Sequence, residues 1–460
     1  MSSHSPSRRT LLRAMSALPA SVLLAGELPA LLGTARAAAP AAGTADRYTI
    51  VAFTNTGDTT VNVYQADDAT DFRLLRAAAY TPPADRIRDA SLFRHTDGYY
   101  YLTYTTHAWQ DTSTTIGFAR SSDRLTWTHL YDHAVPLAGL SRAWAPEWFV
   151  DPDGSVHVIV SCSPTSDEWD FTPYLLTAAD SALTAWSAPV PLAGIGPNHI
   201  DTFVVKIGST YHAFTKNETT KYIEYATATS LAGPWTLRRT GDWAGWGSYR
   251  EGPALVRLDN GGWRLFFDGY GAGQYLFSDS YDTFASWTAP QALPGISGTA
   301  RHFTILKEQV TASPLLTPGT TRSLRSANFP TRYWQTRSNL LNLAVVGATG
   351  SAAERQAATF SVLPGLADAN AFSFRDSAGN HLRHYGFRAR FDPDAGTAQF
   401  AGDATFVARP GATAGSVRLE SWNYPGRYLR HADYQLRVDL ADGSDLFRSD
   451  STFTPVTPLA

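Results

Sequence analysis

The stretch Tyr99-Tyr100-Tyr101-Leu102-Thr103-Tyr104, followed by Thr126-Trp127, decides the fold. The first part is a strand in which aromatic residues alternate with others. A second strand and a turn follow it, and then an aromatic residue stands before the last strand. The pattern recurs five times between residues 47 and 305, with marker aromatics 49 to 59 residues apart: Phe72, Trp127, Trp186, Trp235 and Trp287. This spacing is typical of propeller blades. We therefore predict an all-β chain in which residues 47–310 form a five-bladed β-propeller. The marker aromatics are expected to pack between blades.

A second repeat system follows a Pro/Thr linker at residues 311–321. Residues 322–460 contain three copies of a shorter β-rich unit. The third copy is the clearest, because it reads Asn-Tyr-Pro-Gly-Arg-Tyr-Leu-Arg-His at 423–431 and closes with Asp-Ser-Thr-Phe at 450–453. Units of about 45 residues are too small to bury a core alone. We therefore expect the three copies to combine into one β-trefoil domain.

The first 37 residues have the pattern of a twin-arginine signal peptide. Arg8-Arg9 precedes an apolar run, and Ala35-Arg36-Ala37 supplies a small-x-small cleavage site. Proline and glutamate interrupt the apolar run, which is shorter than the roughly 20 residues that a membrane-spanning helix needs. We expect a secreted protein, exported by the twin-arginine route, whose mature chain has a flexible start at residues 38–46.

The composition narrows the range of partners. Of 460 residues, 17% are charged and 12% are aromatic, which is typical of a folded, β-rich protein. The formal net charge is −3, and residues 1–37 contain four arginines and one glutamate, so the mature chain carries about −6 and is poorly suited to nucleic acid. The single cysteine, Cys162, excludes an internal disulfide and fits a buried apolar position. We expect a monomer without a membrane partner.

Three carboxylates stand directly before apolar runs in different blades. They are Asp89, Asp201 and Glu251. Hydrolysis of a glycosidic bond needs two carboxyl groups across that bond, one protonated and one ionised. One such acid alone is best explained as a turn residue that accepts backbone N–H bonds. Three of them at matching strand positions favour a shared catalytic site on the propeller axis.

The order of the motifs around these acids resembles glycoside hydrolase family 43. The motifs are Arg-Asp-x-Ser-Leu at 88–92, Trp-Ala-Pro-Glu at 144–147, Ile-Asp-x-Phe-Val at 200–204 and Arg-Glu-Gly-Pro-Ala at 250–254. The resemblance covers residues 47–310 and is greatest to the exo-acting 1,5-α-L-arabinofuranosidases. It implies inversion, with Asp89 as general base, Glu251 as general acid and Asp201 as the residue that orients the acid. The family usually has proline after the base, where this chain has Ala90.

The inverting mechanism that the resemblance implies sets the distance between the base and the acid, and also the protonation state of the acid. An inverting route leaves about 6.5–9.5 Å between the base and the acid for a water molecule. Like-charge repulsion from Asp201 is expected to keep Glu251 protonated near neutral pH.

Further residues are expected to form the sugar-binding pocket, where aromatic faces contact C–H groups and polar tips fix hydroxyls. They are Trp109, Trp144, Glu147, Asn198, His199, Arg250 and His302. Packing between blades explains Trp144 equally well. His302 matches a family position near the axis where a histidine can hold a structural ion or a water, and an ordinary hydrogen-bonded histidine is the alternative. We expect no cofactor to be required.

Residues 322–460 resemble the family 42 carbohydrate-binding module, or AbfB domain, which binds arabinofuranose. The implied sugar-binding residues are two pairs that stand 19 residues apart, His384 with Asp403 and His431 with Asp450. Repeat one has Thr336 and Ala357 instead. The resemblance thus implies two sugar pockets and one structural repeat. The alternative is that these pairs only hold their repeats together.

We therefore expect an exo-acting, inverting α-L-arabinofuranosidase that acts on 1,5-arabinan, arabino-oligosaccharides or another arabinose-containing plant polysaccharide. An endo-arabinanase, a β-xylosidase and an enzyme that removes arabinose side chains from arabinoxylan are alternatives, because loop shapes around the pocket decide among them. A non-catalytic, lectin-like propeller is the alternative from another class. The presence of all three acids argues against it.

Overall fold

The computed structural model describes residues 44–164, 170–311, 315–347 and 350–460. The regular secondary structure of the described residues is almost entirely strand, with three helices of five or six residues. The predicted signal peptide at 1–37 lies outside them. No helix among the described residues has the length and apolar character to cross a membrane.

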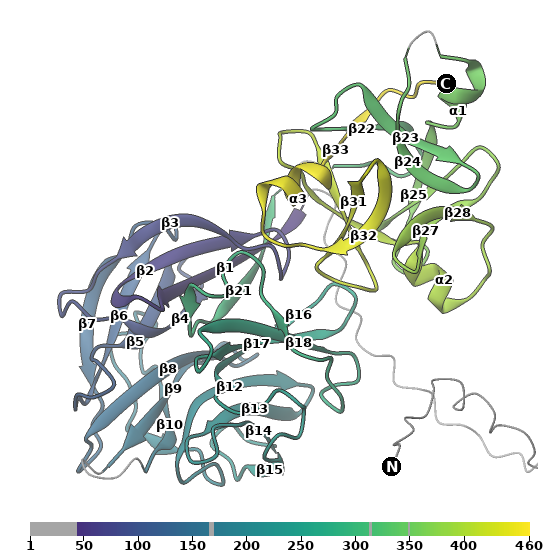
Figure 1. The fold of residues 1–460 in the computed structure, drawn as a ribbon. Helices are drawn as coiled ribbons and strands as arrows, with labels where there is room; N and C mark the ends of the chain where they lie inside the picture. The colour runs from purple at the N-terminus through teal and green to yellow at the C-terminus, as the bar shows by residue number, and fades with distance from the viewer. Residues whose placement is uncertain (1–43, 165–169, 312–314, 348–349) are drawn as a thin grey trace, which may run out of the picture. The chain divides into compact units, whose positions relative to one another are not determined.

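Five sheets follow one another along the first part of the chain (Figure 1). The first contains β1 (Thr44–Thr54), β2 (Gly57–Ala66) and β3 (Arg73–Tyr80), with β20 (Ala300–Arg301) and β21 (Ile305–Thr311) paired to β1. The second contains β4 (Arg88–Arg94), β5 (Tyr100–Thr105), β6 (Thr115–Ser121) and β7 (Thr128–Ala134). The third contains β8 (Arg142–Val150), β9 (Val156–Ser163), β10 (Thr172–Thr177) and β11 (Val190–Pro191).

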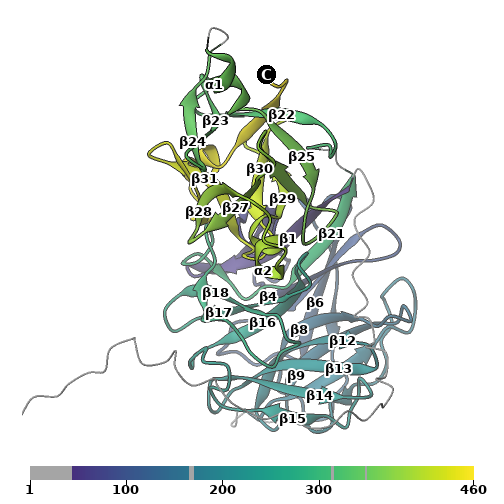
Figure 2. The same ribbon diagram turned by 90° about the vertical axis from the view of Figure 1, so that its right-hand side faces the viewer.

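The last two sheets complete the propeller. The fourth contains β12 (His199–Ile207), β13 (Thr210–Asn217), β14 (Ile223–Ala228) and β15 (Thr236–Arg239), which lie side by side in Figure 2. The fifth contains β16 (Glu251–Arg257), β17 (Trp263–Gly269), β18 (Gln274–Ser280) and β19 (Gln291–Ala292). Because β21 pairs with β1 from Thr44↔Thr311 to Ile50↔Ile305, the end of the propeller completes its first blade. The predicted five-bladed, all-β propeller is confirmed.

The marker aromatics pack as predicted. Phe72, Trp127 and Trp235 are buried in the apolar cores. Trp186 and Trp287 are partly buried and contact the preceding blade, because the ring of Trp186 stacks on Phe118 of β6 and that of Trp287 meets Phe214 of β13 edge to face. Cys162, on β9, is also fully buried, and burial raises the pKa of its thiol.

A β-bulge interrupts the innermost strand of four blades at the same point. The first residue of each bulge has a left-handed backbone, with φ of 51° at Asp89, 45° at Ala145, 54° at Asp201 and 56° at Gly252. A bulge adds one residue and redirects the side chains beside it. Asp89 and Asp201 therefore occupy equivalent positions, whereas Glu251 stands one residue earlier. The expectation of three matching positions holds for the two aspartates only.

The C-terminal part is a closed β-barrel. Its ring of strands consists of β22 (Thr321–Ser326), β25 (Phe360–Pro364), β26 (Phe372–Arg375), β29 (Phe406–Pro410), β30 (Val417–Ser421) and β33 (Phe453–Val456). The ring closes because β33 pairs with both β22 and β30. Each repeat also supplies a hairpin: β23 (Arg332–Arg337) with β24 (Leu340–Val345), β27 (His381–Tyr385) with β28 (Arg388–Asp392), and β31 (Arg427–Ala432) with β32 (Gln435–Leu440).

The three hairpins also pair with one another, through β24–β28, β24–β32 and β28–β32. The closed barrel confirms an all-β second domain, and the trefoil itself stays a prediction. One short helix belongs to each repeat: α1 (Ala352–Gln356), α2 (Ala398–Asp403) and α3 (Asp445–Asp450). Trp334, Phe374 and Phe453 are fully buried at the centre, where their rings meet edge to face.

Candidate active site

A pocket of about 460 Å³ brings the three predicted acids together. Asp89 comes from β4, Asp201 from β12 and Glu251 from β16, so three different blades contribute. The volume lies in the range of roughly 300–1,000 Å³ that is typical of small-ligand sites. The residues that line the pocket are Arg88, Asp89, Thr105, His107, Trp109, Trp144, Ile200, Asp201, Lys216, Glu218, Lys221, Tyr249, Glu251, Tyr270, Arg301 and His302.

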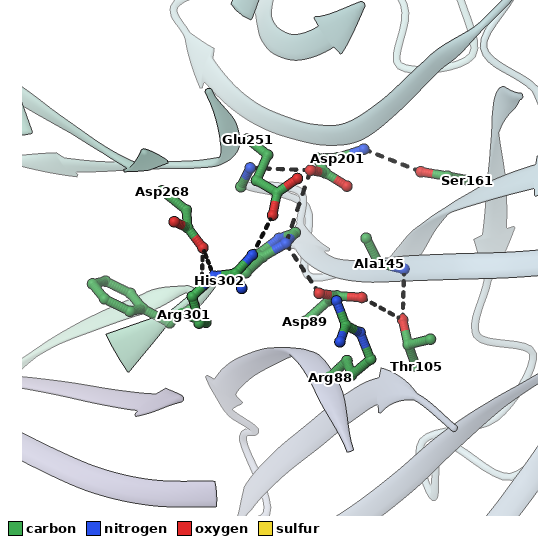
Figure 3. Close-up of polar contacts among 12 residues, drawn as sticks. Arg88, Asp89, Thr105, Ala145, Ser161, Asp201, Glu251, Asp268, Arg301 and His302 are labelled. Atoms are coloured by element: carbon green, nitrogen blue, oxygen red, sulfur yellow. Dashed lines mark hydrogen bonds and ion pairs between the residues drawn. The ribbon is translucent and has the colours of Figure 1, made fainter. Parts of the chain in front are cut away.

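Asp89 is held as a carboxylate (Figure 3). Thr105 Oγ1 donates a hydrogen bond to its Oδ2 over 2.8 Å, and Nδ1 of His302 lies 3.2 Å from its Oδ1. Burial alone would raise the pKa of Asp89. The charge and hydrogen bond of His302, with the hydrogen bond from Thr105, outweigh burial and keep the pKa well below its usual range. Asp89 is therefore ionised at neutral pH, as a general base has to be.

His302 lies between two acids. Its Nδ1 is 3.2 Å from Asp89 Oδ1 and 3.8 Å from Asp201 Oδ2. Burial favours the neutral ring, but the charges of Asp201 and Asp89 outweigh it and raise the pKa of His302 to about 10. The ring is therefore a cation in the physiological range, and it is the central positive charge of the site.

Of the three acids, Asp201 is the one whose pKa is raised. Its Oδ2 accepts a hydrogen bond from the backbone N–H of Gly252 over 3.0 Å, and its own N–H donates to Ser161 Oγ over 3.1 Å (Figure 3). Burial, helped by the charge of Glu251 and opposed by that of His302, raises the pKa of Asp201 to about 6. Through Gly252, Asp201 also fixes the backbone beside Glu251.

Glu251 is paired with a cation at each oxygen. Arg301 Nη2 lies 2.9 Å from Oε1, and Lys216 Nζ lies 2.9 Å from Oε2. Burial raises the pKa of Glu251, but the charges of Lys216 and Arg301 outweigh burial and lower it. The expectation that Asp201 keeps Glu251 protonated does not hold in this structure, because the two nearby cations outweigh the repulsion between the acids.

Arg301 is itself fixed by a second acid. Its Nε forms an ion pair with Oδ2 of Asp268, on the neighbouring strand β17 (Figure 3). Asp268 is fully buried, and burial together with the charge of Glu251 raises its pKa to about 7. The guanidinium therefore joins Glu251 to the interior of the fifth blade.

Two of the predicted aromatics form pocket walls. Trp144 donates from Nε1 to Nε2 of His107 over 3.1 Å, and its ring packs against Phe171 with centroids 4.7 Å apart. Trp144 thus both lines the pocket and packs inside the protein, so its two interpretations are compatible. Trp109 is about half exposed, at 51%, and Tyr249 is similar, at 54%. They offer aromatic surface to a sugar.

Four predicted substrate-binding residues are not among those that line the pocket. Glu147 is buried and accepts hydrogen bonds from Ser91 Oγ at 3.0 Å and Thr304 Oγ1 at 2.6 Å. Nε2 of His199 lies 3.0 Å from Glu224 Oε2. Asn198 donates to Thr219 Oγ1 over 2.6 Å, and Arg250 donates to the Trp246 carbonyl over 2.9 Å. Glu147 instead links two segments of the site. Ser91 lies two residues after Asp89 on β4, Thr304 lies two residues after His302, and both donate to the Glu147 carboxylate.

Sequence reasoning missed the cations of the site, Arg88, Lys216, Lys221 and Arg301, and also His107 and Tyr270. Only Arg88 and Arg301 stand directly beside a predicted residue, in Arg88-Asp89 and Arg301-His302. This position next to a predicted residue was the signal in the sequence that could have identified Arg88 and Arg301. Lys216 is on β13, the second strand of its blade, where no motif marks it.

No three His, Cys, Asp or Glu residues in the described ranges are placed to hold a metal ion. The imidazole of His302 is instead paired with Asp89 and Asp201. The axial ion that the family resemblance suggested stays a prediction, and none of the reaction steps proposed for this pocket depends on it.

The C-terminal barrel contains two matching polar clusters, each built by two repeats. In the first, Asn423 Oδ1 lies 3.1 Å from His384 Nε2, and Asn423 Nδ2 donates to Asp403 over 2.8 Å. The ring of Tyr424 meets that of His384 edge to face at 5.4 Å. The predicted pair of repeat two is thus joined to the Asn-Tyr motif of repeat three.

The second cluster repeats this pattern. Asn328 Oδ1 lies 3.0 Å from His431 Nε2, and Asn328 Nδ2 donates to Asp450 over 2.7 Å. The ring of Phe329 meets that of His431 at 5.2 Å. Repeat one, which lacks its own His/Asp pair, therefore contributes Asn328 and Phe329 to the cluster of repeat three.

Two sequence models of known families match the chain. The model of a probable glycosyl hydrolase domain, related to glycoside hydrolase family 43, matches residues 47–313 and so covers more than half of the chain. The model of the alpha-L-arabinofuranosidase B (ABFB) domain matches residues 322–455.

Curated relatives are similar over a shorter stretch. A probable alpha-L-arabinofuranosidase B of Aspergillus fumigatus is 37% identical over 119 residues, which are 25% of this chain and 24% of that protein. An alpha-L-arabinofuranosidase of Hypocrea jecorina is 36% identical over 122 residues, which are 26% of this chain and 24% of that protein. The chain thus spans about a quarter of the length of these relatives. Among solved structures, a thermostable family-43 glycoside hydrolase aligns over 56% of this chain and 96% of its own, with 14% identity and a TM-score of 0.43.

Proposed function

The chain belongs to the family of probable glycosyl hydrolase domains related to glycoside hydrolase family 43, and we propose that it is a secreted, exo-acting, inverting α-L-arabinofuranosidase. The proposed substrates are 1,5-linked arabinan, arabino-oligosaccharides and other arabinose-containing plant polysaccharides. We further propose export by the twin-arginine route and a monomeric protein.

The observation that carries the proposal is the shared pocket of Asp89, Asp201 and Glu251. Asp89 is ionised, because His302 and Thr105 stabilise its carboxylate. Glu251 comes from a different blade, so a sugar in the pocket can have one acid on each side. Glycoside hydrolysis needs two carboxyl groups that face one pocket and whose pKa values are set by different neighbours.

In the proposed reaction, Asp89 removes a proton from a water molecule as the water oxygen attacks the anomeric carbon. The bond from that carbon to the departing oxygen breaks, and Glu251 gives its proton to that oxygen. The products are a free arabinose of inverted configuration and a shortened glycan. Asp89 then holds the proton and Glu251 is a carboxylate, so the charges balance.

The preference for arabinofuranose is supported by the domain combination. The curated relatives are named alpha-L-arabinofuranosidases, and the C-terminal residues match the domain that takes its name from such an enzyme. The two His/Asp/Asn clusters offer neighbouring donors and acceptors for sugar hydroxyls. Two weak sites on one chain would increase its residence on a polymer through avidity.

Exo action is supported by the size of the pocket. About 460 Å³ suits the end of a glycan, and Trp109 and Tyr249 supply exposed aromatic surface for the next sugar unit. An endo-acting enzyme would instead need an open groove for a chain that continues in both directions.

The test is incubation with linear 1,5-arabinan, followed by identification of the products. We expect arabinose alone, released first as the inverted anomer in proton NMR. A ladder of oligomers would mean endo action, and cleavage of β-xylosides or arabinoxylan side chains would mean one of the other specificities. Retention of the initial configuration would contradict inversion. Binding to arabinan without any product would identify a lectin-like propeller.

A further inference from the structure

Lys216 shares its ammonium between two carboxylates inside the pocket. Its Nζ lies 2.9 Å from Glu251 Oε2 and 2.7 Å from Glu218 Oε2, and its side chain is only 3% exposed. The ammonium also lies 4.6 Å from the centre of the Tyr270 ring. The ammonium donates a hydrogen bond to Glu251, whereas its contact with Glu218 Oε2 is an ion pair without hydrogen-bond geometry. A lysine ammonium has three donors, so one remains available for Glu218.

A general acid needs an oxygen that can carry a proton towards the substrate. Both oxygens of Glu251 already face a cation, Oε1 towards Arg301 and Oε2 towards Lys216. One of these contacts therefore has to open before Glu251 can act. Arg301 is the less movable partner, because it is also paired with the fully buried Asp268.

Lys216 has an alternative partner. Glu218 already contacts its ammonium, and Lys221 contacts the other oxygen of Glu218. When Lys216 leaves Glu251, it therefore stays paired with Glu218, and no buried cation is left without a counter-charge.

We propose that Lys216 is a positioning residue that controls when Glu251 can carry the catalytic proton. In the free enzyme it holds Glu251 as a carboxylate. An incoming leaving group moves the ammonium from Glu251 to Glu218, and Glu251 then takes up one proton from solvent, which it passes to the departing oxygen. The inference rests on the proposed hydrolysis, and it assigns a role to a residue on a second blade strand rather than to one of the three acids.

Several other charged or titratable groups act on Glu251, and they remain in a Lys216 variant. They are Asp201 on β12, Asp268 and Tyr270 on or just after β17, Tyr275 on β18, Arg301 on β20, and His302. The charge of Lys216 is the largest lowering contribution to the pKa of Glu251. Removing it should therefore make Glu251 easier to protonate.

The first experiment is a carbon-13 NMR titration of glutamate carboxyl groups in the full chain, with Glu251 identified from the Glu251→Gln variant. Lys216→Met should move the Glu251 titration upward by about one pH unit or more. The matched control is Lys221→Met, which removes a cation that the described residues pair with Glu218 and not with Glu251, and it should move the Glu251 titration much less. Equal shifts in the two variants, or no shift, would overturn the proposal. If Lys216→Met does not fold, Lys216→Gln serves, because its amide can still donate to an acid.

The second experiment uses the Asp89→Asn variant with bound 1,5-arabinobiose. The Glu251 titration should lie higher in the complex than in the same variant alone, because the ligand displaces the ammonium. An unchanged titration at saturation would contradict the displacement. In otherwise wild-type protein, Lys216→Met should move the alkaline limb of kcat/KM to higher pH, whereas a purely structural role would lower activity equally at all pH values. If no arabinofuranoside is cleaved, the proposed function fails, and the first titration still decides whether Lys216 holds Glu251 as a carboxylate.

Discussion

Nδ1 of His302 lies 3.2 Å from Oδ1 of Asp89, and this ion pair sets the charge of the proposed general base. Burial by itself would raise the pKa of Asp89, but the charge and hydrogen bond of His302 more than offset it. The pKa of His302 is raised to about 10, so the histidine stays charged below that pH. The carboxylate of Asp89 therefore has a cationic partner in both acidic and neutral solution. The base and its partner cation thus come from opposite ends of the propeller sequence.

Replacing His302 with glutamine should raise the pKa of Asp89, because the positive charge is lost while an amide donor remains. The base has to be ionised, so the acidic limb of kcat/KM should move to higher pH by about one unit or more. Activity would fall first in acid. The measurement is a pH profile from strongly acidic to neutral conditions. His212→Gln is the control, because His212 is also buried, lies 2.6 Å from the Tyr225 hydroxyl, and has its pKa lowered by burial alone. An acidic limb that does not move in His302→Gln would contradict the role of the ion pair.

The acid and the base should respond differently to the leaving group. Asp89→Asn and Glu251→Gln should each lower kcat on 1,5-arabinobiose by about 10²–10⁴-fold. An aryl arabinofuranoside with an acidic phenol leaves without protonation, so Glu251→Gln should recover much of its rate on that substrate while Asp89→Asn should not. Steady-state kinetics on both substrates check this. Recovery of Asp89→Asn in place of Glu251→Gln would reverse the two assignments.

Gly252 has no room for a side chain. A Cβ there would lie 2.6 Å from Cδ2 of His302, and the residue has φ of +56°. Gly252→Ala should therefore destabilise the fold by about 2 kcal/mol or more, through backbone strain and overlap, and should lower activity by displacing His302. Gly57→Ala is the matched control, because nothing lies within 4 Å of its added Cβ, and its stability should change by less than about 0.5 kcal/mol. Thermal unfolding separates the two, and equal stability would show that the bulge tolerates a side chain.

The His/Asp clusters of the barrel should control binding to polymer and not hydrolysis itself. The double variant His384→Ala with His431→Ala should lose retention on insoluble arabinan but keep its turnover of a small soluble arabinofuranoside. Thr336→Ala is the control in repeat one, because its hydroxyl is buried without a hydrogen bond among the described residues. A pull-down beside a soluble-substrate assay tests both properties. Retention that survives the double variant would favour a purely structural role for the histidines.

The contribution of repeat one can be tested on its own. Asn328→Ala removes both of its bonds to His431 and Asp450, so arabinose binding by calorimetry should fall from two sites to one. Asn423→Ala should remove the other site in the same way, because it makes the equivalent bonds to His384 and Asp403. An unchanged stoichiometry in Asn328→Ala would mean that repeat one is structural only.

Local sequence patterns were sufficient for the architecture. Five aromatic strand repeats predicted five blades, because alternating burial along a strand is visible in one segment at a time. Asp89, Asp201 and Glu251 were predicted for the same reason, since each stands where an inner strand begins. The neighbours of these acids were harder to predict. Glu147, Asn198, His199 and Arg250 lie close to a predicted acid or motif in sequence, but their side chains are bonded elsewhere.

By itself, the sequence determined the repeats, the three acids and the His/Asp pairs of the second and third units. Only the tertiary structure decided the charges around them. Lys216 and Arg301 reach Glu251 from 35 and 50 residues away, and Asn328 reaches His431 from 103 residues away. The physical reason is that an ion pair depends on distance in space. Blade packing and barrel closure set that distance, and no local pattern records it.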